Sequence, residues 1–136
     1  MLNPVTDTDG APFWEYAAQG ELRVQACADC GEPRFPPRPC CPHCQSFASE
    51  WRLTGGHGRI WSYVVPHPPL LPDYAEQAPY NVVVVELEDA PRIRLVGNLV
   101  RHAGDPLNSL DPERIRIGAR VHAVFPDGGL PQWVLS

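Results

Sequence analysis

Two short cysteine motifs place the strongest constraint on how this chain can fold. Cys27 and Cys30 form one Cys-x-x-Cys hook, and Cys41 and Cys44 form a second. Four thiolates from two such hooks are the soft, tetrahedral ligand set of a structural zinc ion. A closed set of four sulfur ligands leaves no open position for water or substrate. We therefore expect this metal to stabilise the fold and to do no chemistry.

Other uses of these cysteines fit less well. The chain has five cysteines, an odd number for disulfide pairing, and a two-residue gap is a poor closure for an ordinary disulfide. Iron in a rubredoxin-like site would take the same four ligands, and the residues alone do not separate it from zinc. We interpret Cys40 as a spare thiol, because the Cys-Pro-x-Cys turn begins at Cys41, and His43 as a solvent-facing turn residue.

The composition favours a small β-rich protein. The chain has 136 residues with 17 prolines and 11 glycines, which disfavours long helices and favours short strands joined by turns. A ribbon of about 35 residues cannot bury enough apolar surface to fold without its metal. No apolar run approaches the ~20 residues of a membrane span. We therefore expect a cytoplasmic protein with reduced thiols and no membrane segment.

Charge is distributed unevenly along the chain. The formal net charge is −5, and the chain contains arginine but no lysine. Acids dominate residues 61–90, whereas arginines concentrate in residues 91–120. The overall acidity argues against a broad surface for nucleic acid. A small anionic ligand remains compatible with the sequence, because the planar guanidinium group binds phosphate well.

The residues before the first hook predict a loose end and one short helix. Residues 1–11 are polar, and we expect partial disorder there. Residues 12–22 begin with proline and have a glycine near their end, which suits a short helix. Phe13, Trp14 and Tyr16 lie on this helix. They can pack on the chain's own ribbon or barrel, or form a partner interface, and both interpretations stay open.

Alternating apolar residues and turn signals predict short strands in the rest of the chain. We expect strands at residues 22–26, 47–53, 60–65, 80–87, 92–100, 115–118 leading into 120–125, and 133–135. The valine-rich strand 80–87 should be buried on both faces. Glycines should form a turn at 55–58, and the proline-rich segment 66–79 should be a functional loop.

This pattern predicts a mainly β fold. Residues 1–21 should form an N-terminal tail and short helix, and residues 22–49 a rubredoxin-like zinc ribbon. Residues 50–136 should form a five-stranded OB-fold barrel, because a β-sandwich would need about seven strands.

The order of the motifs resembles a known family. Cys-x-x-Cys-Gly, Phe-Pro-Pro-Arg, Cys-Pro-x-Cys, Gly-x-Gly-x-Ile-x-Ser-Tyr, a proline-rich loop, Pro-Tyr before a run of valines, and Arg-Ile-Gly-x-x-Val follow one another between Phe13 and Trp133. This order is similar to that of the zinc-ribbon plus OB-fold family of acyl-CoA-associated proteins. The resemblance covers nearly the whole chain and carries the metal-ligand role over to Cys27, Cys30, Cys41 and Cys44.

The resemblance implies an accessory component and not an enzyme in its own right. Similar proteins accompany thiolase-fold enzymes, hydroxymethylglutaryl-CoA synthase, lipid-transfer-protein-like aldolases or MaoC-like hydratases of the hot-dog fold, sometimes as a fused domain. In actinobacterial steroid side-chain degradation, similar domains pair with an aldolase that cleaves a β-hydroxyacyl-CoA. The implied role is to bind and position acyl-CoA, or to dock on the enzyme that processes it, in steroid side-chain or fatty-acid degradation.

The ligand contacts and the competing functions are less constrained by the sequence. Arg59, Arg92, Arg94 and Arg101 are candidates for the phosphates of CoA on charge alone, and each could also lie on a solvated barrel face. We interpret His57, between two glycines, as a turn residue, and we find no activated nucleophile motif. Two competing functions stay open: a nucleic-acid-binding ribbon and OB module, and an acyl-transfer or hydratase enzyme.

Overall fold

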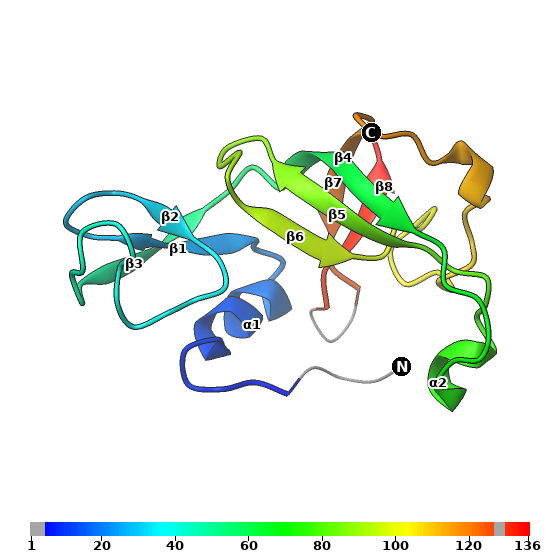
Figure 1. Cartoon of the computed structure of the whole chain (residues 1–136), viewed down its shortest axis with the longest axis horizontal. Helices are drawn as coiled ribbons and strands as arrows, with labels where there is room; N and C mark the ends of the chain where they lie inside the picture. The colour runs from blue at the N-terminus through cyan, green and yellow to red at the C-terminus, as the bar shows by residue number, and fades with distance from the viewer. Residues whose placement is uncertain (1–4, 127–129) are drawn as a thin grey trace.

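The structure is a computed structural model that describes residues 5–126 and 130–136. Figure 1 places a small ribbon sheet at one end of the molecule and a barrel at the other, with helix α1 beside their junction. The ribbon strands are β1 (Arg23–Cys27), β2 (Pro33–Arg34) and β3 (Ser49–Leu53). The barrel strands are β4 (His57–Val64), β5 (Val82–Leu87), β6 (Arg94–Gly97), β7 (Arg120–Val124) and β8 (Gln132–Leu135). The helices are α1 (Ala11–Ala18), α2 (Pro72–Ala75) and the short 3₁₀ helix η1 (Pro112–Arg114).

The five barrel strands have the connectivity of an OB-fold. Their order is β6-β5-β4-β7-β8, and all neighbours are antiparallel. The chain after β6 closes the barrel through a parallel bridge between Leu99 and Trp133. Trp133 N–H donates to Asn98 O, and Val100 N–H donates to Trp133 O, each at 2.9 Å. The first barrel strand thus pairs with the second and fourth, and the third closes on the fifth, which confirms the predicted five-stranded barrel.

One hydrophobic core runs from the barrel to the ribbon. Trp133, Val83 and Val85 are buried inside the barrel, while Phe13 on α1 and Leu22 before β1 join the same cluster. The predicted burial of both faces of the valine run is wrong. Alternate residues of β5 are buried and the others are half-buried, because only one face of this barrel strand points inward.

The glycine-rich segment before β4 differs from the predicted turn. Gly56 has a positive φ of 72°, as a turn requires, but Gly58 lies within β4. A Cβ atom on Gly58 would lie 2.5 Å from Val85 Cγ1, so this position needs glycine for close strand approach. His57 is the first residue of β4 and pairs with His122 on β7, so the interpretation of His57 as a turn residue is wrong.

Several element boundaries also differ from the prediction. Helix α1 ends at Ala18, earlier than residue 22, and Gly20 follows with φ 81°. Residues 115–118 do not open a strand, because η1 precedes them and Gly118 has φ 91°. Residues 7–10 form a turn, in which Asp7 Oδ1 accepts from Gly10 N–H at 2.6 Å, and are not a loose end. The disorder predicted for residues 1–4 lies outside the described residues.

Two connections bear on the later argument. The loop 66–79 contains α2, and Tyr74 on it packs against Tyr80 with ring centroids 5.7 Å apart. Strand β3 pairs with β1 as far as Leu53, so the ribbon sheet extends past residue 49. The division of the chain into domains remains a prediction.

Candidate functional site

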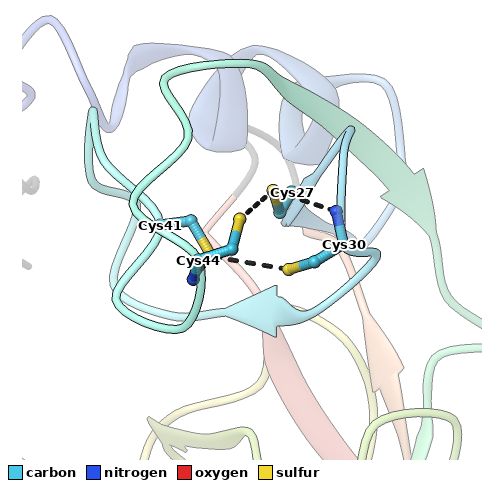
Figure 2. Close-up of side chains that lie close together, drawn as sticks. All are labelled: Cys27, Cys30, Cys41 and Cys44. Atoms are coloured by element: carbon cyan, nitrogen blue, oxygen red, sulfur yellow. Dashed lines mark hydrogen bonds between the residues drawn. The ribbon is translucent and has the colours of Figure 1, made fainter.

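The four hook cysteines lie together at the end of the ribbon, with the two hooks facing one another (Figure 2). Their sulfur atoms all lie within 4.8 Å of one another. Cys27 Sγ is 3.5 Å from Cys44 Sγ, and Cys30 Sγ is 3.7 Å from Cys41 Sγ. A tetrahedral zinc ion with bonds of about 2.3 Å separates its ligands by about 3.8 Å. The cluster therefore fits zinc, and the separations are well above the ~2.05 Å of a disulfide.

The two hooks have the same backbone geometry. The shared hydrogen bonds are Cys30 N–H to Cys27 Sγ (3.4 Å), Cys44 N–H to Cys41 Sγ (3.5 Å), Gly31 N–H to Cys27 O (3.0 Å) and Gln45 N–H to Cys41 O (2.8 Å). The residue after each hook has a positive φ, 80° at Gly31 and 66° at Gln45. Each hook is thus a tight turn that presents two sulfur atoms in the same way.

Backbone amides favour the thiolate form of one cysteine in each hook. The amide of Cys30 lowers the pKa of Cys27 to about 6, and the amide of Cys44 lowers the pKa of Cys41. The amide of Ser46 lowers the pKa of Cys44, but the contacts with Cys27, Cys30 and Cys41 together with burial outweigh it and raise the pKa to about 12. A bound cation is needed to hold all four groups as thiolates at neutral pH.

Two residues in or beside the second hook, Cys40 and His43, are not part of the sulfur cluster. Cys40 is half-buried, and its sulfur contacts Cys41 O at 3.8 Å. His43 is exposed to solvent. Both positions agree with their interpretation as a spare thiol and a turn residue. The zinc site predicted from the cysteine spacing is confirmed, and it is structural because four thiolates complete the ligand shell.

A groove of about 610 Å³ lies between α1 and the barrel. Its aromatic lining consists of Phe13, Trp14, Phe35, Tyr74, Tyr80 and Trp133. The groove runs along all of β6 and is bounded by the loop after β4 and by Leu130 and Pro131 before β8. This is the face, formed by the second and third barrel strands and two flanking loops, that OB-folds use for ligands. Among the described residues that line it, Arg94 is the only charged one.

The three aromatic residues predicted as a partner interface do not share one surface. Phe13 is 6% exposed and belongs to the core. Trp14 is half-buried and lines the groove. Tyr16 faces the ribbon, where the Arg23 guanidinium lies 4.7 Å above its ring and Trp51 packs 6.3 Å away. A role in partner binding remains a prediction for all three, and Trp14 has the most suitable position.

The four candidate arginines are also dispersed. Arg92 forms an ion pair with Glu32 at 3.2 Å. Arg59 donates to Gly118 O at 3.0 Å. Arg94 pairs with Glu86 at 3.6 Å, and its guanidinium lies 4.1 Å from the ring centroid of Trp61. Arg101 lies in the segment after the barrel closure. The structure does not bring them into one phosphate site.

A buried polar network escaped the sequence prediction. Arg34 Nε donates to Gln25 Oε1 at 2.8 Å, and Arg34 Nη2 donates to Arg38 O at 2.8 Å. Gln25 Oε1 also accepts from Arg38 N–H at 2.7 Å. The network holds the stiff Phe35-to-Arg38 segment against β1, and so positions Phe35 in the groove wall. A glutamine in a strand carries no signal that it will meet a buried arginine.

Comparison with known families matches two successive parts of the chain. A model described as the rubredoxin-like zinc ribbon domain of ChsH2 matches residues 14–50, and one for the C-terminal OB-fold domain of ChsH2 matches residues 51–126. The chain belongs to the ChsH2 family. As a ChsH2-family chain it combines both matched domains, which agrees with the resemblance seen in its motifs.

Curated relatives of this ChsH2-family chain include longer proteins that are named as hydratase subunits. A probable enoyl-CoA hydratase alpha subunit of Thermomonospora curvata is 41% identical over 87% of the chain and 33% of its own length. The 3-oxo-4,17-pregnadiene-20-carboxyl-CoA hydratase alpha subunit of Mycobacterium tuberculosis is 34% identical over 98% of the chain and 40% of its own length. The chain thus spans less than half of either relative. A DUF35 domain-containing scaffold protein of Methanothermobacter thermautotrophicus is 32% identical, with coverage of 87% and 82%.

A solved structure resembles this chain over almost the full length of both. A chain described as Ltp2-ChsH2(DUF35) aldolase superposes with a TM-score of 0.82 at 36% identity, covering 98% of both chains. The ChsH2-family chain is thereby similar, over almost its whole length, to a protein found in an aldolase structure. None of the helices among the described residues is both long and apolar enough to cross a membrane.

Proposed function

We propose that the chain is a non-catalytic accessory component that docks on a CoA-thioester enzyme and binds and positions its acyl-CoA. The observation that carries this proposal is the similarity, over 98% of both chains, to the chain described as Ltp2-ChsH2(DUF35) aldolase. Relatives called hydratase alpha subunits and scaffold proteins support it. The partner is a thiolase-fold enzyme, such as a lipid-transfer-protein-like aldolase or a thiolase, or a MaoC-like hydratase.

The groove beside α1 supplies a physical basis for docking. A 610 Å³ groove lined by six aromatic rings offers the apolar contact area that protein partners and CoA ligands use. Its walls come from α1, the ribbon and the barrel, so it depends on the zinc-stabilised arrangement of the chain. We assign the partner contact to Trp14, which combines groove lining with partial exposure.

The lining of the groove supports acyl-CoA over nucleic acid. An OB-fold that follows a nucleic-acid backbone combines stacked aromatics with a line of basic residues. Here Arg94 is the single charged residue among the described residues of the groove, and Glu86 already pairs with it. The setting we propose is lipid metabolism, either steroid side-chain or fatty-acid degradation.

The test is recovery of the partner from the native host. A tagged chain should co-purify with a thiolase-fold or MaoC-like enzyme, identified by mass spectrometry. Trp14→Ala should lower this recovery at least tenfold, since buried tryptophans are frequent hot spots worth about 2 kcal/mol or more. Phe47→Ala is the matched control, because Phe47 is 78% exposed and does not line the groove.

Two results would contradict the proposal. Isolation of the chain as a lone monomer would remove the accessory role. Equal loss of the partner in the Trp14 and Phe47 variants would remove the groove as the docking surface. Zinc content and circular dichroism of each variant establish that it is folded before recovery is compared.

A further inference from the structure

Most arginine side chains of this protein are already engaged. Among the described residues, eight of the eleven arginines donate a hydrogen bond to, or form an ion pair with, an acceptor within the chain: Arg23, Arg34, Arg52, Arg59, Arg92, Arg94, Arg116 and Arg120. The side chains of Arg38, Arg101 and Arg114 have no such acceptor among those residues. Unengaged guanidinium groups are the ones available to an external anion.

Two of these three arginines meet in one pocket. Arg101, after the barrel closure, and Arg114, at the end of η1, both line a cavity of about 170 Å³ together with His102. Its apolar floor consists of Val100, Leu110, Val134 and Leu135. No carboxylate is among the lining residues in the part of the chain that the structure describes. We call this cavity the Arg101 pocket.

A nearby contact orients the histidine of the Arg101 pocket. His102 Nδ1 lies 3.2 Å from Asp105 Oδ2, and the backbone N–H of His102 donates to the same oxygen at 3.1 Å. This double contact fixes the orientation of the His102 ring beside the two arginines. It also occupies one oxygen of Asp105, the carboxylate that pairs with His102.

We propose that the Arg101 pocket binds a phosphate group of a phosphorylated ligand. Two planar guanidinium groups can each donate two parallel hydrogen bonds to phosphate oxygens. Val100 and Leu110 at the floor are buried, whereas Arg101 and Arg114 are exposed, so a phosphate from solvent can reach both guanidinium groups. A cavity of about 170 Å³ is smaller than the roughly 300 Å³ of a site for a whole drug-sized ligand, so it takes one phosphate or a diphosphate.

The source of this phosphate follows from the proposed function, on which this step rests. CoA carries a 3′-phosphate and a diphosphate at its nucleotide end, so the Arg101 pocket holds that end while the rest of the molecule extends to the partner enzyme. This proposal assigns phosphate binding to a pair, Arg101 and Arg114, of which only Arg101 is among the four arginines predicted from the sequence.

Isothermal titration of the zinc-loaded full chain, at low and at moderate salt, tests the Arg101 pocket without any partner enzyme. The ligands are pyrophosphate, adenosine 3′,5′-bisphosphate and CoA. We expect saturable binding that weakens with salt, and an affinity about tenfold or more lower in Arg101→Gln and in Arg114→Gln, since each removes charge-assisted hydrogen bonds. Arg38→Gln is the matched control, because it removes an equally unengaged arginine outside the pocket and should leave the affinity unchanged.

The outcomes separate the anion site from its source and from the proposed function. Absence of binding by all three ligands, or equal weakening in the Arg38 variant, overturns the Arg101 pocket. Binding of CoA with loss in both pocket variants supports the proposal in full. Binding of pyrophosphate but not of CoA keeps the phosphate site and overturns CoA as its source. None of these results depends on recovery of a partner enzyme. The accessory role is therefore tested separately, by the co-purification experiment.

Discussion

Individual zinc ligands differ sharply from the neighbouring thiol in what they contribute to stability. Cys27→Ser or Cys44→Ser should abolish stoichiometric zinc and unfold the ribbon, at a cost of more than about 4 kcal/mol, because loss of a metal is among the most damaging substitutions. Cys40→Ser should cost less than about 0.5 kcal/mol, since Cys40 lies outside the sulfur cluster. Elemental analysis and thermal unfolding measure both effects. Equal damage from all three substitutions would show that the ligand shell includes Cys40.

Gln45 is the residue at which the second hook departs from the first. Both hooks need a left-handed residue after the second cysteine, and Gly31 meets this need at no steric cost whereas Gln45 has φ 66°. Gln45→Gly should therefore stabilise the chain by up to about 1 kcal/mol, the cost of the left-handed region less the added freedom of the unfolded glycine. The measurement is the thermal midpoint of zinc-loaded protein, with Gly31→Ala as the destabilising counterpart. A lower midpoint for Gln45→Gly would contradict this account of the hook.

At the scale of elements, β4 and β5 approach so closely at Gly58 that one added methyl group should disturb their packing. A Cβ at Gly58 would lie 2.5 Å from Val85 Cγ1 and 2.6 Å from the carbonyl oxygen of Glu86. The carbonyl belongs to the paired strand and cannot move away, so Gly58→Ala should destabilise the barrel by about 1–3 kcal/mol. Gly55→Ala is the control, because its Cβ would meet only side-chain atoms, the nearest being Asp89 Oδ2 at 3.1 Å, and no backbone atom of a paired strand. Urea unfolding followed by circular dichroism compares the two, and equal midpoints would refute the close-approach argument.

Local patterns predicted the elements whose shape is set locally. The zinc site follows from spacing, because each hook is a single turn that presents its own two sulfurs. Five barrel strands follow from alternation and turn residues. Residues 115–118 carry a strand pattern but lie in a loop, because Asp111 begins η1 by accepting a hydrogen bond from Glu113 N–H.

Features built by the closure of the barrel could not be predicted in this way. The groove joins residues of α1, the ribbon and β6, which are far apart in the chain. The Arg101 pocket exists because the segment after β6 pairs with Trp133, which brings β8 beside residues 100–102. Charge alone selected Arg101 with three arginines that lie elsewhere, and nothing local marked Arg114. Tertiary pairing therefore decides which polar residues share a site.

At the scale of the whole molecule, zinc stabilises one half more directly than the other. The ribbon sheet has three strands, and its β2 has only two residues. The barrel closes its own hydrogen-bonding network and contains most of the buried residues of the core, whereas the ribbon contributes few of them. A small sheet with few core residues depends on its metal, but a closed barrel does not.

Removal of zinc by a chelator should therefore unfold the ribbon before the barrel. Hydrogen exchange followed by mass spectrometry should show loss of protection in peptides covering β1 and β3, while peptides covering β5 and β7 keep at least part of theirs. Re-addition of zinc should restore protection of the ribbon. Simultaneous loss of protection in both halves would mean that the shared core makes the chain one cooperative unit. With the barrel intact and the ribbon unfolded, the groove loses the wall formed by Phe35, and Phe13 on α1 loses its packing against that ring. Metal-free protein should then lose its partner enzyme but keep the phosphate affinity of the Arg101 pocket, whose residues all belong to the barrel half.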